Sequence, residues 1–431
     1  MPSTLSTPKR PRHDWTSLPY DIIGSEAKRF LAGDDIDSYV AFCGTCSDWH
    51  KATEDYPEKA VSTDPTHFQP SKWALLHQRD DHVTLVNVDT GRFFCKNISL
   101  LHKYIFIGAT GGGLILLGEL MEPHHACVLN PFTGSIAHFK VPVPVAGVRA
   151  VAVTTAPLMV FISIHHGHIM WADQDSECFK RFWCTYSNRP TCMTHFAGQV
   201  YAVDQQGSVI SAVVDSVTVG EQRPRSAQTI SMETIIPSLD TSPDTSHLEP
   251  IRTRTYYLVE SGGDLLLVRP PWLDRNDPFV HRVDTERKVL KPVSSIGNRA
   301  IFAGPVRCLS VEADKFPGII GGCIYFVMEP EMIRGDYKPP SVMVFHITEG
   351  CQDLITFGCA TPEGCFRPLT LVQDLADYCR YIHYSELFEI NAREWALDLS
   401  SDSDESSYSE TDDEGSYSET DDEASSSKCE V

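Results

Sequence analysis

The sequence predicts a mainly-β protein in which a small helical module precedes a closed array of short strands. Three observations support this organisation. Apolar residues recur at helical spacing within residues 14–55, short β-rich runs alternate with turn residues from about residue 70 to 392, and residues 398–431 form a low-complexity acidic tail. Residues 1–13 are basic and rich in Pro, Ser and Thr, so this N-terminus and the acidic tail are expected to be disordered.

The composition limits the choice of partners and compartment. The formal net charge is −22 at pH 7, and an acidic surface repels phosphate backbones, so nucleic acid is not an expected partner. The longest apolar run, 158–164, is strand-sized, so no membrane association is expected. Because residues 1–13 do not resemble a secretory signal, we expect an intracellular protein with free thiols, in the cytoplasm and/or the nucleus.

The helical module is expected to contain two helices. Asp14 and Ser17 are candidate caps for the first, and residues 33–35 should end it and cap the second. The second helix is expected to continue to Trp49 with Gly44 inside it, at a cost of about 0.5–1 kcal/mol relative to Ala. So short a module cannot build a core alone and should need a partner helix or a neighbouring domain.

The central region contains many short strands and few helical stretches, which is typical of a closed all-β architecture. Residues 86–91 (VNVDTG) resemble residues 129–134 (LNPFTG), which lie 43 residues further along the chain. A period of roughly 40–50 residues is typical of a four-stranded propeller blade, so the region predicts a β-propeller of six or seven blades. Residues 221–250 are polar without periodicity and are expected to form a long loop between blades.

The acidic tail carries a repeat, since residues 407–414 (SYSETDDE) recur at 416–423. Four hydroxyl residues have an acidic residue three positions later, as acidophilic kinases of the casein-kinase-II type prefer. These possible phosphorylation sites are Ser409, Thr411, Ser418 and Thr420. A plain solubilising tail is an equally good interpretation.

The helical module resembles an F-box. The family pattern is Leu-Pro, an acidic residue, aliphatic residues and a late Cys and Trp, and it matches Trp15, Leu18, Pro19, Asp21, Ile22, Ile23, Leu31, Cys46 and Trp49. Downstream, residues 68–73, 129–134 and 322–326 are similar to segments of the kelch-like KIB-type β-propeller (domain of unknown function 295) of plant F-box proteins.

This resemblance implies a substrate-recognition subunit of an SCF-type ubiquitin ligase that is not itself an enzyme. A Skp-type adaptor of a cullin complex would dock on Leu18, Pro19, Ile22, Ile23, Leu31, Cys46 and Trp49, and the propeller would bind a target protein that the sequence does not identify. Thr45 and His50 depart from the family pattern and weaken the expected grip. The alternative is a protein-binding propeller with a vestigial F-box and no role in ubiquitin transfer.

No catalytic, cofactor-binding or metal-binding residues are expected. Cys43 and Cys46 lack the second ligand pair that a structural zinc site needs, and the cluster of His165, His166 and His168 lacks accompanying Cys or carboxylate ligands. Residues 111–113 (GGG) precede a strand-like run and not the helix of a phosphate-binding loop. A propeller hydrolase, which would need convergent carboxylates near the central channel, is the third and least favoured hypothesis.

Overall fold

The computed structural model describes residues 18–32, 35–49, 51–53, 72–79, 81–132, 134–144, 147–164, 168–182, 190–214, 230–237, 256–271, 279–328, 331–333, 336–338, 341–356 and 370–380. All of them lie within the unit Met1–Phe388. None of the helices in this part of the chain has the length and apolar character required to cross a membrane. The cysteines that it contains are free thiols.

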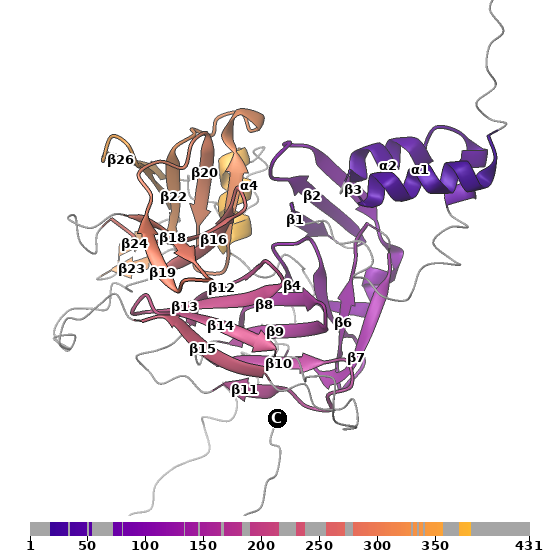
Figure 1. The fold of residues 1–431 in the computed structure, drawn as a ribbon, viewed down its shortest axis with the longest axis horizontal. Coiled ribbons are helices and arrows are strands. Elements are labelled where there is room, and N and C mark those ends of the chain that lie inside the picture. Colours follow the sequence, from indigo (N-terminus) through magenta and orange to yellow (C-terminus); the bar gives the residue numbers. More distant parts are fainter. Residues whose placement is uncertain are drawn as a thin grey trace, which may run out of the picture. The chain divides into compact units, whose positions relative to one another are not determined.

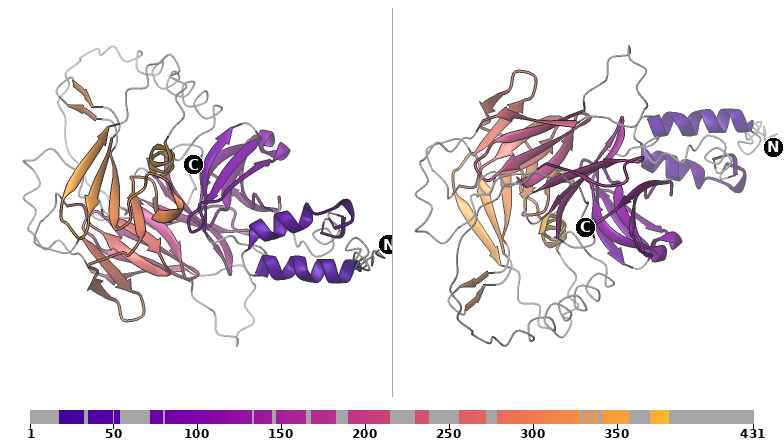
Figure 2. Two further views of the ribbon diagram at one scale, coloured as in Figure 1. Left: turned by 90° about the horizontal axis from the view of Figure 1, so that it is seen from above. Right: turned by 90° about the horizontal axis from the view of Figure 1, so that it is seen from below.

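The N-terminal part consists of helices α1 (Tyr20–Ala32) and α2 (Ile36–Cys43), which lie side by side (Figure 2). Asp35 caps α2, because its Oδ1 accepts the backbone N–H of Ser38 at 3.0 Å, and hydrogen bonding to Ser38 lowers the pKa of Asp35. The expectation of one helix reaching Trp49 is wrong. Helix α2 ends at Cys43 and Gly44 lies in a turn before further helical residues at 47–49, so Gly44 imposes no cost inside a helix.

Six antiparallel or mixed sheets follow, which we call blades 1 to 6 (Figure 1). Blade 1 contains β1 (Trp73–Arg79), β2 (His82–Asn87) and β3 (Phe93–Asn97). Blade 2 contains β4 (Tyr104–Ala109), β5 (Ile115–Glu119), β6 (His125–Leu129) and β7 (Ile136–Pro142). Blade 3 contains β8 (Val148–Thr155), β9 (Leu158–Ile164), β10 (Ile169–Asp173) and β11 (Lys180–Phe182).

Blade 4 contains β12 (Pro190–Phe196), β13 (Gln199–Asp204), β14 (Val209–Val214) and β15 (Ile230–Ile236). Blade 5 contains β16 (Tyr257–Ser261), β17 (Asp264–Val268), β18 (Val280–Asp284) and β19 (Val289–Pro292). Blade 6 has the order β21-β20-β22-β25-β26 and contains β20 (Arg299–Ala303), β21 (Cys308–Glu312), β22 (Cys323–Met328), β25 (Ser341–His346) and β26 (Gln352–Thr356). The short strands β23 (Glu331–Ile333) and β24 (Asp336–Lys338) form a separate hairpin.

Hydrophobic clusters join each blade to the next. Residues of blades 1 and 2 share one cluster, and further clusters join blades 2 and 3, 3 and 4, 4 and 5, and 5 and 6. A sixth cluster joins blade 6 back to blade 1, with Val86 of β2 and Phe302 of β20 among its members. Each sheet therefore buries both faces against neighbours, and the fold is a six-bladed β-propeller.

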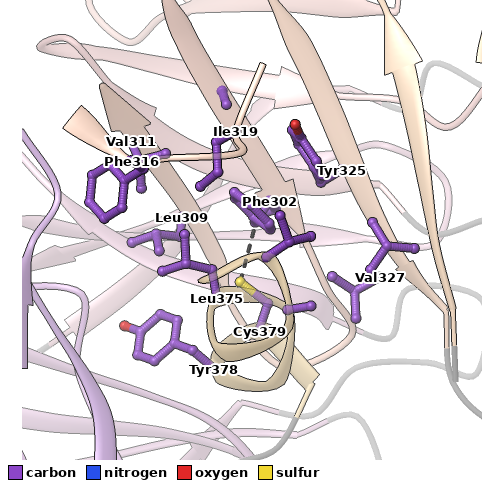
Figure 3. Packing of buried hydrophobic residues seen from close by; sticks show 14 of the residues in the cluster. Phe302, Leu309, Val311, Phe316, Ile319, Tyr325, Val327, Leu375, Tyr378 and Cys379 are labelled. Carbon is purple, nitrogen blue, oxygen red and sulfur yellow. Dashed lines mark hydrogen bonds between the residues drawn. The ribbon is translucent and has the colours of Figure 1, made fainter. Parts of the chain in front are cut away.

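Helix α4 (Leu371–Arg380) packs where blade 6 meets blade 1, in contact with β1, β20 and β22 (Figure 3). Its residues Leu375, Tyr378 and Cys379 are buried in the sixth cluster. The Cys379 thiol donates to the carbonyl of Phe302 at 3.8 Å. We call this contact region, formed by α4 with the facing strands of blades 1 and 6, the closure seam. The sequence patterns predicted strands and loops here and missed this helix.

The repeated turn found in the sequence has one geometry in both copies. The N–H groups of Gly91 and Gly134 donate to the carbonyls of Asn87 and Asn130, at 2.9 and 2.8 Å. In each copy the Asn side-chain oxygen also accepts the N–H two residues later, at 3.0 Å. The turns join β2 to β3 and β6 to β7, so β1 corresponds to β5, the second strand of blade 2. Within the described residues, blade 1 has no counterpart of the innermost strand β4.

The structure also corrects the expected loop at 221–250. Strand β15 lies within it, pairs with β14 and forms the outermost strand of blade 4. Its residues Ile230, Ile235 and Ile236 are buried. Most residues of the segment 221–250 are polar, so its overall composition indicated a loop.

Candidate protein-interaction site

Helix α1 divides its apolar residues between a buried and an exposed set. Ile23 and Ala27 are 1% and 2% exposed, whereas Tyr20 and Ile22 are 55% and 48% exposed. The carbonyl of Pro19 accepts the N–H groups of Ile22 and Ile23 at 3.1 and 3.2 Å, so the helix begins directly after the Leu-Pro pair. The exposed pair is an apolar surface that a partner protein can cover.

Three aromatic rings connect α1, α2 and the helical residues that follow. The Phe42 ring centroid lies 5.4 Å from that of Phe30 and 4.5 Å from that of Trp49. The backbone N–H of Trp49 donates to Cys46 Sγ at 3.5 Å, and the Thr53 hydroxyl donates to the Trp49 carbonyl at 2.9 Å. Trp49 is therefore held within the helical module and is half-buried.

The residues predicted to bind an adaptor have different environments. Pro19 and Ile22 are exposed, Leu18, Cys46 and Trp49 are half-buried, and Ile23 is buried. Leu31 belongs to α1, but its side chain lies outside the described residues, as do the predicted phosphorylation sites Ser409, Thr411, Ser418 and Thr420.

Thr45, one of the departures from the F-box pattern, has a local role. Its hydroxyl donates to the carbonyl of Ala41 at 3.0 Å and so satisfies a carbonyl in the last turn of α2. Thr45 itself is exposed. An aliphatic residue at this position would lose that hydrogen bond, so the departure is explained by how α2 ends. His50 lies outside the described residues.

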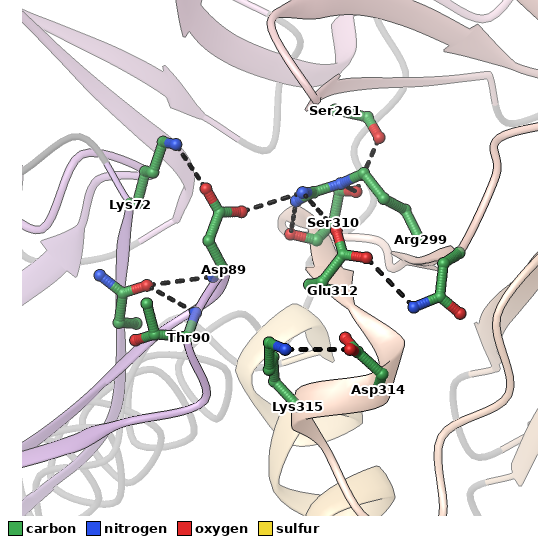
Figure 4. Close-up of polar contacts among 11 residues, drawn as sticks. Lys72, Asp89, Thr90, Ser261, Arg299, Ser310, Glu312, Asp314 and Lys315 are labelled. Carbon is green, nitrogen blue, oxygen red and sulfur yellow. Dashed lines mark hydrogen bonds and ion pairs between the residues drawn. The ribbon is translucent and has the colours of Figure 1, made fainter.

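On the propeller, a polar network crosses between blades 1 and 6 (Figure 4). Arg299 at the start of β20 donates to Asp89 Oδ1, to Ser310 Oγ and to the Ser310 carbonyl, each at 2.9 Å, and lies 3.4 Å from Glu312 Oε2. Lys72 pairs with the other oxygen of Asp89. Burial alone would raise the pKa of Asp89, but the hydrogen bonds from Lys72 and Arg299 outweigh it and hold that pKa below its ordinary value.

The charged side chains of this network are paired with one another. Asp89 and Glu312 both face the guanidinium of Arg299, whose side chain is only 15% exposed. Ser261 of blade 5 reaches the same group of residues through a 2.8 Å hydrogen bond to Ser310. The arrangement joins three blades and is explained by closure of the ring, so we assign it a structural role.

Two groups of side chains in the described part of the chain could hold a metal ion. One contains Glu119, Cys127 and His138, and the other contains His346, Glu349 and Cys351. Neither group includes the residues that the sequence analysis considered and rejected as ligands, Cys43 with Cys46 and the cluster of His165, His166 and His168. Of the latter, His165 and His166 lie outside the described residues, and His168 lies between β9 and β10.

Comparison with solved structures gives likenesses at low similarity. They include BBS1N in complex with ARL6DN (10% identity, TM-score 0.27, 66% of this chain and 74% of that chain). Another is the dihydro-heme d1 dehydrogenase NirN in complex with DHE (10% identity, TM-score 0.30, 68% of this chain and 55% of that chain). A third is the computationally designed Ika8 protein (10% identity, TM-score 0.29, 63% of this chain and 80% of that chain). At these scores the likenesses carry no argument about function. The search of curated proteins gave no match.

The family comparison is informative because it covers most of the chain. The model of the KIB1-4 beta-propeller family matches residues 85–346, a range that begins in β2 and ends with β25. This range contains the second half of blade 1, all of blades 2 to 5 and most of blade 6. The chain belongs to the KIB1-4 beta-propeller family.

Proposed function

We propose that this chain is the substrate-recognition subunit of an SCF-type ubiquitin ligase, like the plant F-box proteins that it resembles. The N-terminal helices act as an F-box and dock a Skp-type adaptor, and the propeller binds a target protein. The chemistry of ubiquitin transfer resides in other subunits of the cullin complex. This role would place the protein in the cytoplasm and/or the nucleus.

The observation that carries the proposal is the exposure of Tyr20 and Ile22 directly after Leu18-Pro19. An F-box has to keep apolar side chains at the surface, because the adaptor groove covers them on binding. Ile22 sits in the F-box pattern and is 48% exposed, while its neighbour Ile23 is buried. The helix therefore divides the motif into residues that hold the module together and a residue that is available to a partner.

The propeller supports the second half of the proposal. Hydrophobic clusters join the six blades, and the turns between strands can present side chains to a protein surface. A β-propeller is compatible with a protein-binding domain, but its fold does not specify which protein it binds.

The alternative is a protein-binding propeller whose F-box is vestigial. The packing of Trp49 on Phe42 favours it, because a ring used inside the module contributes less area to an adaptor. In that case the propeller binds its partner regardless of changes in α1.

The test is binding of the full chain to a plant Skp-type adaptor, measured by calorimetry or pull-down. Ile22→Asp places a charge on the exposed face of α1, and Ile320→Asp is the matched control because Ile320 is a propeller isoleucine that is 53% exposed. We expect Ile22→Asp to abolish binding and Ile320→Asp to retain it. The Leu18→Ala, Trp49→Ala double variant should also lose binding. No binding by the parent chain, or equal binding by both Asp variants, would support the vestigial F-box.

A further inference from the structure

Four side chains with metal-ligating atoms lie on one face of blade 2. Cys127 of β6 pairs with Leu117 of β5 and with His138 of β7, so these positions share a face of the sheet. Side chains alternate along a strand. Glu119, two residues after Leu117, and His125, two residues before Cys127, therefore lie on that face as well.

The ligating atoms of these side chains converge. Cys127 Sγ lies 3.2 Å from His138 Nδ1, and the same nitrogen lies 3.5 Å from Glu119 Oε1. His125 Nδ1 lies 3.3 Å from Glu119 Oε2. Bond lengths of about 2.3 Å to sulfur and about 2.1 Å to nitrogen or oxygen give ligand–ligand edges of about 3.4–3.6 Å in a tetrahedral zinc site. The two separations from His138 Nδ1, 3.2 Å to sulfur and 3.5 Å to the carboxylate oxygen, are close to these edges, and the ligand atoms of Glu119, Cys127 and His138 all lie within 4.8 Å of one another.

The geometry does not fit a nucleophilic triad. In such a triad the thiol contacts one ring nitrogen of the histidine and the carboxylate contacts the other. Here both partners approach Nδ1 of His138, so this nitrogen, the sulfur and the carboxylate oxygen surround one point.

A second Cys–His pair in blade 6 provides a contrast. Cys323 Sγ lies 3.2 Å from His346 Nδ1, but the carboxylate of Asp353 lies 3.2 Å from Nε2, on the opposite side of the ring. That histidine lies between Cys323 and Asp353, so these two partners do not surround one point, and the blade 6 group of His346, Glu349 and Cys351 has two exposed members. The two pairs have the same register, since each Cys faces its His on the neighbouring strand.

We propose that Glu119, Cys127 and His138 form a binding site for a zinc-class divalent ion on blade 2. A thiolate, an imidazole nitrogen and a carboxylate oxygen form a donor set typical of zinc, and water can complete the tetrahedron. His125 is a positioning residue that holds the second oxygen of Glu119. Cys127 is fully buried and His138 lies on the surface, so the ion enters from solvent and the sulfur forms the floor of the site.

The site joins three consecutive strands at the base of the β5–β6 turn. A bound ion would therefore stabilise the outer half of blade 2, because it binds the folded chain and not the unfolded one. This inference is independent of adaptor docking, since it concerns residues of the propeller alone.

The experiment measures binding of Zn²⁺ and Co²⁺ to the full metal-free chain. Zinc affinity is obtained by competition with a chromophoric chelator, and cobalt is followed by its thiolate charge-transfer absorption. The variants are made in a Cys351→Ser background, which removes the thiol of the blade 6 group. In this background Cys127→Ser should abolish the cobalt band, and His138→Asn should weaken zinc binding by more than about tenfold. His138→Asn changes an exposed residue, so it keeps the test valid if Cys127→Ser fails to fold.

Cys323→Ser is the matched control, because Cys323 is also a buried cysteine that lies 3.2 Å from a histidine on the next strand. It should retain the cobalt band and the zinc affinity of the parent chain. The proposal is overturned if the parent chain binds neither ion, or if zinc binding is unchanged in both Cys127→Ser and His138→Asn. Loss of the band in Cys323→Ser alone would place the thiolate ligand in blade 6 and would equally refute it.

Discussion

His77 Nε2 of β1 and Asp374 Oδ1 of α4 lie 3.4 Å apart and connect the first strand of the propeller to its last described helix. Hydrogen bonding to Asp374 raises the pKa of His77, and the charges of Asp374 and Asp377 add to this effect, while partial burial opposes it. The raised pKa means that the closure seam favours the protonated imidazole.

We predict that this pair makes the seam less stable as the pH rises. A histidine whose pKa is raised on folding contributes stability that is fully present below its unfolded pKa of about 6.5, and that is lost as the pH rises through its folded value. The midpoint of urea unfolding, measured for the parent chain and for His77→Gln between about pH 5.5 and about pH 8.5, checks this. The urea midpoint of the parent chain should exceed that of His77→Gln by less at the upper end of this pH range than at the lower end.

His195 is a control of opposite sign, because burial lowers the pKa of this residue. The advantage of the parent over His195→Gln should shrink as the pH falls, since a neutral buried imidazole then has to take up a proton. If the His77→Gln difference is independent of pH, the imidazole is not protonated at the seam and the interpretation of the His77–Asp374 pair is wrong.

The sequence predicted the strands of this fold better than its closure. A continuous apolar run predicted β9 with the bounds 158–164 that the structure has. They missed α4, although Val372, Leu375, Ala376 and Cys379 have the spacing of a helix face. The reason is physical. Helix α4 packs against β1, which lies some 300 residues earlier in the chain, and a local sequence pattern contains no information about such distant contacts.

The candidate sites show the same limit. The Leu-Pro pair and its neighbours could be found from sequence, but only the structure separates exposed Ile22 from buried Ile23. Glu119, Cys127 and His138 lie on three strands, and their convergence depends on strand register. The sequence offered one local signal for this site. His125 and Cys127 are two residues apart, so they lie on the same face of one strand, and His138 lies on the next strand.

We predict that Gly304→Ala disrupts the seam. A Cβ on Gly304 would lie 2.4 Å from the Cys379 carbonyl oxygen, and this carbonyl also accepts the N–H groups of Val306 and Arg307, each at 3.2 Å. The backbone of α4 cannot move away without losing these bonds, so the free energy of unfolding should fall by about 1–3 kcal/mol. Gly111→Ala is the control, because a Cβ there would meet nothing within 4 Å. Urea unfolding measures both, and equal effects would show that α4 does not closely approach the turn after β20.

Arg299 should contribute more to stability than an exposed arginine of the neighbouring blade. Its guanidinium makes three hydrogen bonds of 2.9 Å to Asp89 and Ser310, and Lys could not reproduce this arrangement. Arg299→Met leaves Asp89 and Glu312 without their shared cation, so the free energy of unfolding should fall by about 2–3 kcal/mol, with Arg299→Lys intermediate.

Arg282 tests whether this loss is specific to the polar network between blades 1 and 6. It lies 3.7 Å from Asp264 in an ion pair whose side chains are 45% and 50% exposed, so Arg282→Met should change the free energy of unfolding by less than about 0.5 kcal/mol. Urea unfolding of the three variants gives the comparison. If Arg299→Met costs no more than Arg282→Met, the polar network does not hold blades 1 and 6 together, and closure then rests on the hydrophobic cluster and α4 alone.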